Sequence, residues 1–348
     1  MRTGNLFIKA GSLGLAAALI FGGCSGTDHR QQQGSSEQEM IASEEPSRSE
    51  APKEEAYSEV GEPQTAEAHS EVREPQTAEA DWSEYFDGMN GAAVLYDAPA
   101  QRYTVYNASL AGTRRSPCST FKIISSLIGL ESGVIDPGQS TRTWSGETFW
   151  NENWNRDIDF DDAFRASCVW YFRKVTDEIG QERMQEEIDR LSYGNCDISD
   201  WEGNLNTNNG NRALTGFWIE SSLAISPKEQ TEVMERIFGE ASVYSSETRE
   251  ELKRVMLVQE DADTDEDAEE DVSVYGKTGM GMAYGTVVDA WFTGFAERGE
   301  ERVYFCVYLG QTDGKDVSSA AAKEIAIRLA DEYFNNENSD KFSCKELK

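Results

Sequence analysis

The chain has 348 residues, enough for one large domain or two small ones. It carries 64 acidic and 32 basic residues, for a formal net charge of −32. This charge argues against nucleic-acid binding, because phosphate recognition depends on clustered lysine and arginine. Hydrophobic residues make up 38% of the chain and are unevenly distributed, so the sequence divides into three segments.

The first segment, residues 1–23, has the features of an export signal peptide. Arg2 and Lys9 give it a basic start, and its apolar run is too short to span a bilayer comfortably. Cys24 directly follows two glycines, which resembles the lipobox of bacterial lipoproteins, although Phe21 replaces the expected aliphatic residue. The alternative is an ordinary signal peptide followed by an incidental cysteine. We expect an exported protein anchored by a lipid on Cys24 to the outer face of the bacterial cytoplasmic membrane; without the lipid it would be periplasmic or secreted.

The second segment, residues 24–80, is rich in Glu, Gln, Ser, Ala and Pro and poor in large apolar residues. Such a composition cannot bury enough surface to offset chain entropy, so we expect a disordered acidic tether. A polar unit repeats within it with a period of twelve, starting at Ser58 and again at Ser70. Two copies of a polar unit indicate a duplicated spacer and not a solenoid.

The third segment, residues 81–348, has the aromatic and apolar content of one catalytic domain. Its acidic run at 260–271 is expected to be a surface loop; a calcium loop is the alternative, but the spaced ligands and central glycine are missing. Ligand spacing for zinc is also absent. Export permits disulfides, yet the pairing of an odd number of cysteines cannot be deduced. These cysteines are Cys118, Cys168, Cys196, Cys306 and Cys344.

The only histidines are His29 and His69, and both lie in the tether. The catalytic domain therefore cannot contain a Ser-His-Asp or Cys-His unit or a histidine-bound metal. If the domain uses a nucleophile, its general base must be a lysine, a carboxylate or a tyrosine.

Ser119 and Lys122 supply such a pair. They lie three residues apart at the start of an apolar segment that begins after Pro117 and is expected to stop at Gly133, as a buried helix would. Residues three apart on a helix share a face, and the helix dipole favours negative charge near the serine. Apolar neighbours would lower the pKa of Lys122 and leave its amine neutral. Alone, the pattern is common by chance.

Three further motifs follow this pair in chain order. They are Ser167-Cys168-Val169, Tyr193-Gly194-Asn195 and Lys277-Thr278-Gly279. The Ser119-x-x-Lys122 pair together with Lys-Thr-Gly is the signature of serine β-lactamases and penicillin-binding proteins. The Ser-x-Val form and the Phe217-Trp218 pair favour class D. Residues 88–334 thus resemble the class D, or oxacillinase-type, serine β-lactamases.

The resemblance implies hydrolysis of β-lactam antibiotics through an acyl-enzyme. Ser119 would attack the lactam carbonyl, and Lys122 would carry a carbamate made from CO2, an N6-carboxylysine, as general base. Ser167 would pass a proton to the leaving nitrogen. No other cofactor and no metal is implied.

The resemblance also assigns substrate-binding residues. Lys277, also a catalytic residue, and Thr278 would hold the substrate carboxylate and tune the local potential, and Val169, Trp218, Gly279 and Met280 would also contact substrate. The backbone N–H groups of Ser119 and Met280 would form the oxyanion hole. Trp218 would donate its indole N–H to the carbamate. The apolar pocket around the carbamate would be lined by Phe121, Val169, Phe172 and Ile219. The Tyr193-Gly194-Asn195 motif is expected to be a structural turn in the cleft wall.

The sequence departs from the family at two places. Many class D enzymes bind the substrate carboxylate with an arginine near the start of the last helix, where this chain has alanine within residues 317–324. Carboxylate binding would then fall to Lys277 and Thr278, to backbone near Ser273, or to Lys323. A cysteine stands beside each of the two predicted catalytic serines. We therefore consider a disulfide between Cys118 and Cys168 as a hypothesis.

The order of the predicted elements agrees with the family fold. We expect an α/β (α+β) domain of the serine β-lactamase and penicillin-binding transpeptidase type, in which helices flank an antiparallel sheet and a helical subdomain is inserted. A hairpin at 92–107, helices between 119 and 254, strands at 272–277, 290–296 and 303–309, and a helix at 318–334 are predicted.

Two other functions share this fold and its acylation step. One is a non-hydrolytic β-lactam sensor domain, although sensors are joined to membrane-spanning segments and no span beyond the signal is recognised here. The other is a cell-wall transpeptidase or carboxypeptidase, which penicillin would block.

Overall fold

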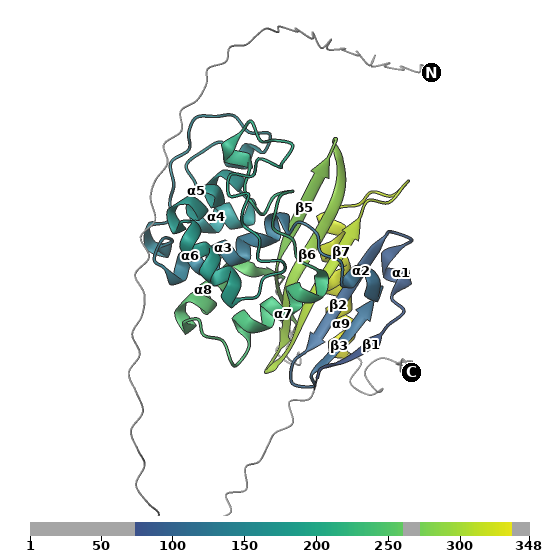
Figure 1. Cartoon of the computed structure of the whole chain (residues 1–348). Coiled ribbons are helices and arrows are strands. Elements are labelled where there is room, and N and C mark those ends of the chain that lie inside the picture. The colour runs from purple at the N-terminus through teal and green to yellow at the C-terminus, as the bar shows by residue number, and fades with distance from the viewer. Residues whose placement is uncertain (1–73, 260–271, 336–348) are drawn as a thin grey trace, which may run out of the picture. The chain divides into compact units, whose positions relative to one another are not determined.

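The structure, a computed structural model, describes residues 74–259 and 272–335. They form one seven-stranded sheet with the order β1-β3-β2-β7-β6-β5-β4 (Figure 1). Neighbouring strands are antiparallel except β1 and β3, which are parallel. The strands are β1 (Gln76–Glu79), β2 (Gly91–Asp97), β3 (Arg102–Tyr106), β4 (Leu257–Gln259), β5 (Ser273–Ala283), β6 (Thr286–Arg298) and β7 (Glu301–Gly310).

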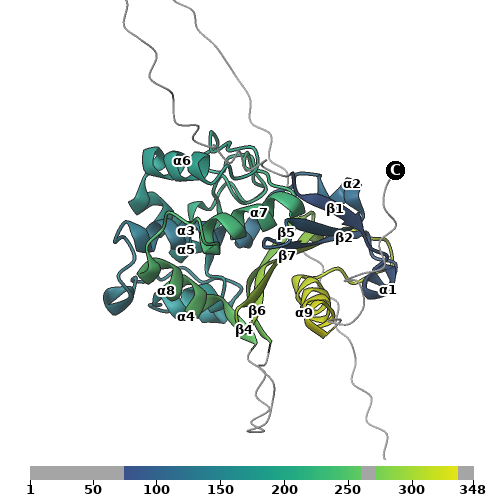
Figure 2. The same ribbon diagram turned by 90° about the horizontal axis from the view of Figure 1, so that it is seen from below.

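Helices cover both faces of this sheet (Figure 2). Most belong to a helical subdomain on one face, and the last helix, α9, packs on the other. The helices are α1 (Ser83–Phe86), α2 (Ala108–Ala111), α3 (Lys122–Glu131), α4 (Phe160–Arg165), α5 (Val169–Ile179), α6 (Gln181–Arg190), α7 (Pro227–Phe238), α8 (Ser246–Met256) and α9 (Ser319–Asn335). Short 3-10 turns are η1 (Cys118–Phe121), η2 (Pro137–Gln139), η3 (Glu152–Trp154) and η4 (Arg212–Leu214).

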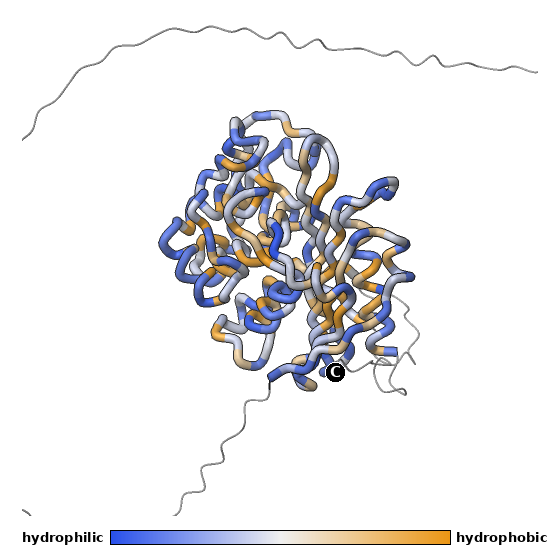
Figure 3. The backbone as a smooth tube through the Cα atoms, turned by 45° about the vertical axis from the view of Figure 1, so that its right-hand side comes forward, coloured by the Kyte–Doolittle hydropathy of each residue, from blue (hydrophilic) through white to orange (hydrophobic). Residues whose placement is uncertain are grey.

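Each face of the sheet has its own hydrophobic core. Alternate residues of a strand point to opposite faces, so on β6 Phe292 packs in the core under α9 and Phe295 in the core under the helical subdomain. Both side chains are fully buried. Figure 3 shows the result along the chain: apolar segments run through the interior and polar segments lie outside.

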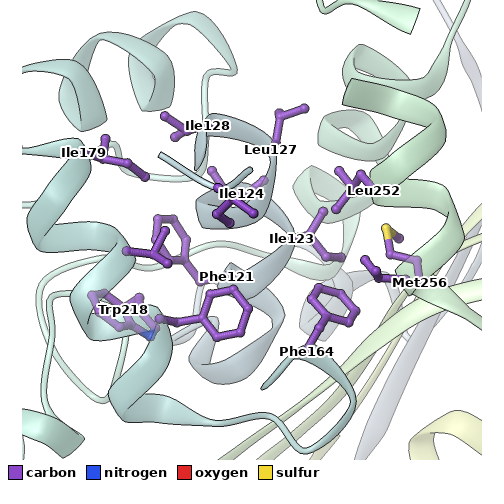
Figure 4. Close-up of a cluster of buried hydrophobic side chains, with 14 of the residues drawn as sticks. Phe121, Ile123, Ile124, Leu127, Ile128, Phe164, Ile179, Trp218, Leu252 and Met256 are labelled. Atoms are coloured by element: carbon purple, nitrogen blue, oxygen red, sulfur yellow. The ribbon is translucent and has the colours of Figure 1, made fainter. Parts of the chain in front are cut away.

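Helix α3 is the centre of the helical subdomain. Ile123, Ile124 and Leu127 are at most 1% exposed and pack among side chains from other helices, including Leu252 and Met256 of α8 (Figure 4). A helix that is apolar on every side is stable only when it is surrounded. It ends where the sequence predicts, because Gly133 directly after its cap has a φ of +73°.

The motif Tyr193-Gly194-Asn195 forms a turn that holds the 217–226 loop. Asn195 exchanges two hydrogen bonds of 2.9 Å with Ala224, one from its backbone N–H and one to its side-chain oxygen. Gly194 has a φ of +56°, and a Cβ placed there would lie 2.0 Å from the Ala224 carbonyl oxygen. Only glycine fits this position. The turn thus fixes a loop that, as shown below, forms one wall of the site.

The predicted fold class is confirmed. The hairpin at 92–107, the three later strands and the final helix all occur, although the helical stretch between 119 and 254 is interrupted by a long irregular segment from 191 to 226. The predicted domain start at residue 81 is wrong by a few residues, because Gln76–Glu79 forms the edge strand β1. This strand is mostly exposed and is held by backbone hydrogen bonds, so it has no apolar alternation to reveal it.

Several predictions fall on residues outside the described ranges: the signal peptide, Cys24, most of the tether, the acidic run and Cys344. Within 74–259 and 272–335, no helix is both long enough and apolar enough to span a membrane.

Candidate active site

Ser119 and Lys122 meet at the junction between η1 and α3. The Lys122 Nζ atom lies 2.8 Å from the Ser119 Oγ atom. Ser119 is on the 3-10 turn η1, and α3 begins at Lys122, so the predicted pairing is correct while the serine precedes the α-helix proper. Thr120 fixes this turn, because its hydroxyl donates to the Pro117 carbonyl at 2.7 Å and accepts from Gln230 of α7 at 3.0 Å.

Lys122 is buried in an apolar pocket and is 1% exposed. Its Nζ lies 5.6 Å from the centre of the Phe172 ring. Trp218 stacks on Phe121, the residue before Lys122, with ring centres 5.6 Å apart (Figure 4). Burial lowers the pKa of Lys122 to about 8, and the nearby thiol of Cys168 opposes this shift. Roughly one amine in ten is then neutral at pH 7, against almost none for an exposed lysine.

A second buried lysine, Lys277, lies on β5. It is 5% exposed, and its Nζ donates to both the carbonyl and the hydroxyl oxygen of Thr278 at 3.2 Å. Burial, and then the positive charge of Lys122, hold the pKa of Lys277 well below its ordinary value. Two amines placed this close cannot both be charged at low cost, so proton uptake by one disfavours the other.

Ser167 lies in the tight turn between α4 and α5 and has a φ of +54°. The neighbouring backbone is fixed by Trp154, whose indole N–H donates to the Ala166 carbonyl at 2.9 Å. A non-glycine residue in the left-handed region costs free energy and persists where its surroundings hold it. The turn presents Ser167 to the same cavity as Ser119.

Strand β5 brings the Lys-Thr-Gly motif against the nucleophile. A Cβ at Gly279 would lie 2.9 Å from the Pro117 carbonyl oxygen, so only glycine lets β5 approach η1 this closely. Strand β4 pairs with β5 only near Val274 and Tyr275. Beyond that point the outer edge of β5, including the backbone of Met280, lies beside the cavity.

A cavity of about 250 Å³ joins these parts. It is bounded by Ser119 and Ser167, by the 278–282 segment of β5 and by loops of the helical subdomain. Its lining residues are Cys118, Ser119, Trp150, Trp154, Ala166, Ser167, Val169, Asn208, Leu214, Ile219, Glu220, Thr278, Gly279, Met280, Met282 and Ser319.

A sequence comparison decides the family. The model of the penicillin binding protein transpeptidase domain matches residues 62–331, well over half of the chain. The chain belongs to this family.

Relatives within the transpeptidase family are named both as hydrolases and as regulators. The chain is 31% identical to the probable β-lactamase YbxI of Bacillus subtilis, covering 71% of this chain and 82% of YbxI. It is 31% identical to β-lactamase OXA-1 of Escherichia coli, covering 71% and 86%. It is 30% identical to regulatory protein BlaR1 of Bacillus licheniformis, covering 72% of this chain and only 38% of BlaR1.

Solved structures show the same two groups of transpeptidase-family proteins. The C-terminal domain of the Bacillus licheniformis BlaR penicillin-receptor aligns with a TM-score of 0.63 and 28% identity, over 75% of this chain and 98% of that domain. A class D β-lactamase from Bacillus subtilis aligns with a TM-score of 0.61 and 29% identity, over 73% and 96%. The resemblance to class D serine β-lactamases is confirmed.

The transpeptidase-type cavity brings together most of the residues predicted from the sequence. Ser119, Ser167, Val169, Thr278, Gly279 and Met280 line it. Lys122, Lys277 and Trp218 lie behind this lining as buried groups. The sequence did not reveal lining residues outside its motifs, among them Trp150, Leu214 and, on β5, Met282. The Phe217-Trp218 pair was recognised, but Glu220, two residues later, was given no role.

The substrate-carboxylate end of the cavity needs a correction. Of the residues considered for it, Ser273 lies at the opposite end of β5, paired with Glu297, and Lys323 does not line the cavity. Ser319, the first residue of α9, does line it. The sequence gives no sign of this, because the position of Ser319 at the cavity depends on how α9 packs against the sheet.

The hypothesis of a Cys118–Cys168 disulfide is wrong in this structure. Both residues are buried free thiols, as is Cys306, and Cys196 is a partly exposed one. Burial raises the pKa of Cys118 to about 12 and that of Cys168 to about 11, so both stay protonated. Across the described ranges, no three His, Cys, Asp or Glu side chains gather as a metal site would require.

The lowered pKa of Lys122 predicts a stability change with pH. Folding moves the pKa from 10.5 to about 8, so the unfolded chain binds more protons between these values. Stability should therefore rise as the pH increases from about 8 to 10.5, by up to about 3 kcal/mol. In CO2-free buffer at pH 7, Lys122→Met should unfold at a higher urea concentration than the unchanged protein, and its stability should rise less with pH, keeping only the contribution of buried Lys277. Equal urea midpoints of the two proteins at pH 7 would contradict a free-energy cost of burying the charged Lys122 amine.

Proposed function

We propose that this protein hydrolyses β-lactam antibiotics through an acyl-enzyme on Ser119. The observation that supports this most directly is the buried Lys122 amine, 2.8 Å from the Ser119 oxygen, with its pKa lowered to about 8. The domain has no histidine that could activate the serine. The chain also matches class D β-lactamases over most of their length.

In the acylation step, the Ser119 oxygen attacks the lactam carbonyl and its proton passes to the Lys122 side chain. The negative charge that develops on the carbonyl oxygen is stabilised by the backbone N–H groups of Ser119 and Met280, a contribution worth about 10² or more in rate per donor. The C–N bond then breaks, and Ser167 passes a proton to the leaving nitrogen. The product is an ester on Ser119 with an opened ring.

Lys277, Thr278 and Ser319 lie at the end of the cavity that would take the substrate carboxylate. Thr278 and Ser319 offer hydroxyl donors at the lining, and Lys277 holds the Thr278 hydroxyl from behind. Without an arginine, the carboxylate would be bound by hydrogen bonds, with Lys277 placed behind the Thr278 hydroxyl. Hydrogen bonds from neutral donors are weaker than those from a guanidinium.

The Lys122 pocket fits the carbamate that class D enzymes carry. Carbamate formation needs a neutral amine, and the lowered pKa provides one. Phe172 lies against the Lys122 amine, and Val169, Ile219 and Trp218, which belong to or pack against the same hydrophobic cluster, would complete the apolar pocket. Such a carbamate would supply a general base able to activate water for deacylation.

A sensor function is the second candidate, supported by the similarity to BlaR1 and to the BlaR receptor domain. Both functions require acylation of Ser119 and differ in whether water releases the acyl group.

Turnover of a chromogenic cephalosporin tests the proposed function. Sustained hydrolysis is expected, and Ser119→Ala should reduce it by at least about 10³-fold, since no other nucleophile is placed to replace the serine. Ser246→Ala, on the exposed start of α8, is the matched control and should keep full activity. One equivalent of product followed by arrest would support the sensor instead.

The carbamate is tested by supplying its carbon. With 13C-bicarbonate, we expect one carbamate signal in the NMR spectrum that is absent from Lys122→Ala, and a hydrolysis rate that rises with added bicarbonate. Removing dissolved CO2 should slow hydrolysis reversibly. A rate and spectrum indifferent to bicarbonate would remove the carbamate from the mechanism.

We also propose that residues 1–23 direct export and that a lipid on Cys24 anchors the protein to the outer face of the cytoplasmic membrane. In a bacterial host fed an alkyne-labelled fatty acid, the full chain should be labelled and sediment with membranes. Cys24→Ser should be unlabelled. An unlabelled wild-type chain in the soluble fraction would instead indicate an ordinary signal peptide.

A further inference from the structure

Glu220 has no role in the acylation steps, yet it lines the cavity in an unfavourable conformation. Its φ is +50°, in the left-handed region that a residue with a long side chain rarely adopts. Such a conformation is energetically unfavourable and persists only where the surroundings hold it. The contacts of Glu220 show what holds it.

The backbone of Glu220 is tied to the segment that leads to the nucleophile. Its N–H donates to the Ser116 hydroxyl at 2.8 Å, and that hydroxyl donates to the Trp218 carbonyl at 3.1 Å. Arg115 and Ile225 exchange two backbone hydrogen bonds of 2.9 Å at the other end of the same loop. The 215–226 loop is thus fixed to the residues just before Ser119.

The side chain of Glu220 reaches across to β5. The backbone N–H of Met282 donates to Glu220 Oε1 at 2.7 Å. In the residues that the structure describes, no lysine or arginine forms an ion pair with this carboxylate. Burial, with a further contribution from the charge of Asp289, raises the pKa of Glu220. A carboxylate held without a cation at this position has one evident partner, the β5 backbone.

The hydrogen bond between the Met282 N–H and Glu220 lies two residues from Met280 on β5. The N–H groups of alternate residues in a strand point to the same edge. The β5–β6 register shifts between Gly281 and Met282, but the extra residue, Val288, lies on β6, so β5 keeps its alternation and the Met280 and Met282 donors share the edge beside the cavity. The Met280 N–H is the donor proposed for the oxyanion hole. Beyond Met282 the β5–β6 hairpin ends at Tyr284, which is fully exposed. Figure 1 shows this hairpin extending past the neighbouring strands.

We propose that Glu220 is a positioning residue that holds the Met280 N–H at the correct separation from the Ser119 N–H. The inference rests on the proposed acylation of Ser119. Through the Ser116 hydroxyl and its own carboxylate, Glu220 connects the nucleophile segment to β5 directly. Oxyanion stabilisation requires donors held to within about 0.5 Å, which the free end of a hairpin does not provide alone.

Three variants separate the hydrogen bond from the charge and from stability. Glu220→Ala removes the acceptor, Glu220→Gln keeps a side-chain oxygen that can accept from Met282, and Glu220→Gly removes the acceptor while relieving the backbone strain. Glu131→Ala is the matched control, since Glu131 accepts hydrogen bonds from the backbone and side chain of Ser245, away from the cavity.

Acylation is measured by stopped-flow with a fluorescent penicillin, which gives the rate constant at saturation and the dissociation constant separately. We expect the saturating rate of Glu220→Ala and of Glu220→Gly to fall about 10- to 100-fold, with less than about a threefold change in dissociation constant. Glu220→Gln should stay within about threefold of wild type, and so should Glu131→Ala. Affinity for phenylboronic acid, whose tetrahedral adduct places an oxygen in the oxyanion hole, should weaken in parallel with the acylation rate.

Certain results with these variants would contradict the proposal. An alanine variant that acylates within threefold of wild type overturns it, and so does a glutamine variant as slow as alanine. If Glu220→Gly regains both thermal stability and acylation rate, the effect of alanine is strain and not the hydrogen bond. A wild-type protein that is not acylated at all defeats the proposed function first, whatever the variants do.

Discussion

The burial of the Lys122 amine is the constraint on which the rest of the site depends. An amine can serve Ser119 as a base only if it is neutral, and burial achieves this at a cost of about 3 kcal/mol below pH 8. Domains are stable by only about 5–15 kcal/mol, so this is a considerable fraction. The apolar residues of α3, buried from Ile123 to Ile128, and the aromatic side chains around Phe121 supply the packing that offsets it.

The same constraint explains why the site is assembled from both halves of the domain. The helical subdomain provides the apolar pocket and Ser167, and the sheet provides a straight edge with backbone donors. The proposed oxyanion hole would take one backbone donor from each half, the Ser119 N–H from η1 and the Met280 N–H from β5, while the helical subdomain surrounds the amine. Gly279 permits the contact between the halves, because any side chain there would separate β5 from the nucleophile turn.

The sequence predicts the chemistry of this site better than its shape. Ser119 and Lys122 are found because a spacing of three residues fixes their relation on one turn, and the absence of histidine limits the other possibilities. Glu220 and Ser319 could not be given roles, because their importance arises from contacts between segments far apart in the chain. Strand β1 was missed for a different reason: its pairing uses backbone atoms, which every residue has.

Strand β1 has a consequence for how the protein can change its length. Its four residues, Gln-Thr-Ala-Glu, belong to the second copy of the twelve-residue unit, and the first copy has the same four residues at 64–67. Loss of residues 69–80 would leave an identical Gln-Thr-Ala-Glu-Ala directly before Asp81, and gain of a unit would do the same. Recombination between the two copies of the repeat can therefore lengthen or shorten the segment before the domain by one unit. Each product would still encode the four residues of β1.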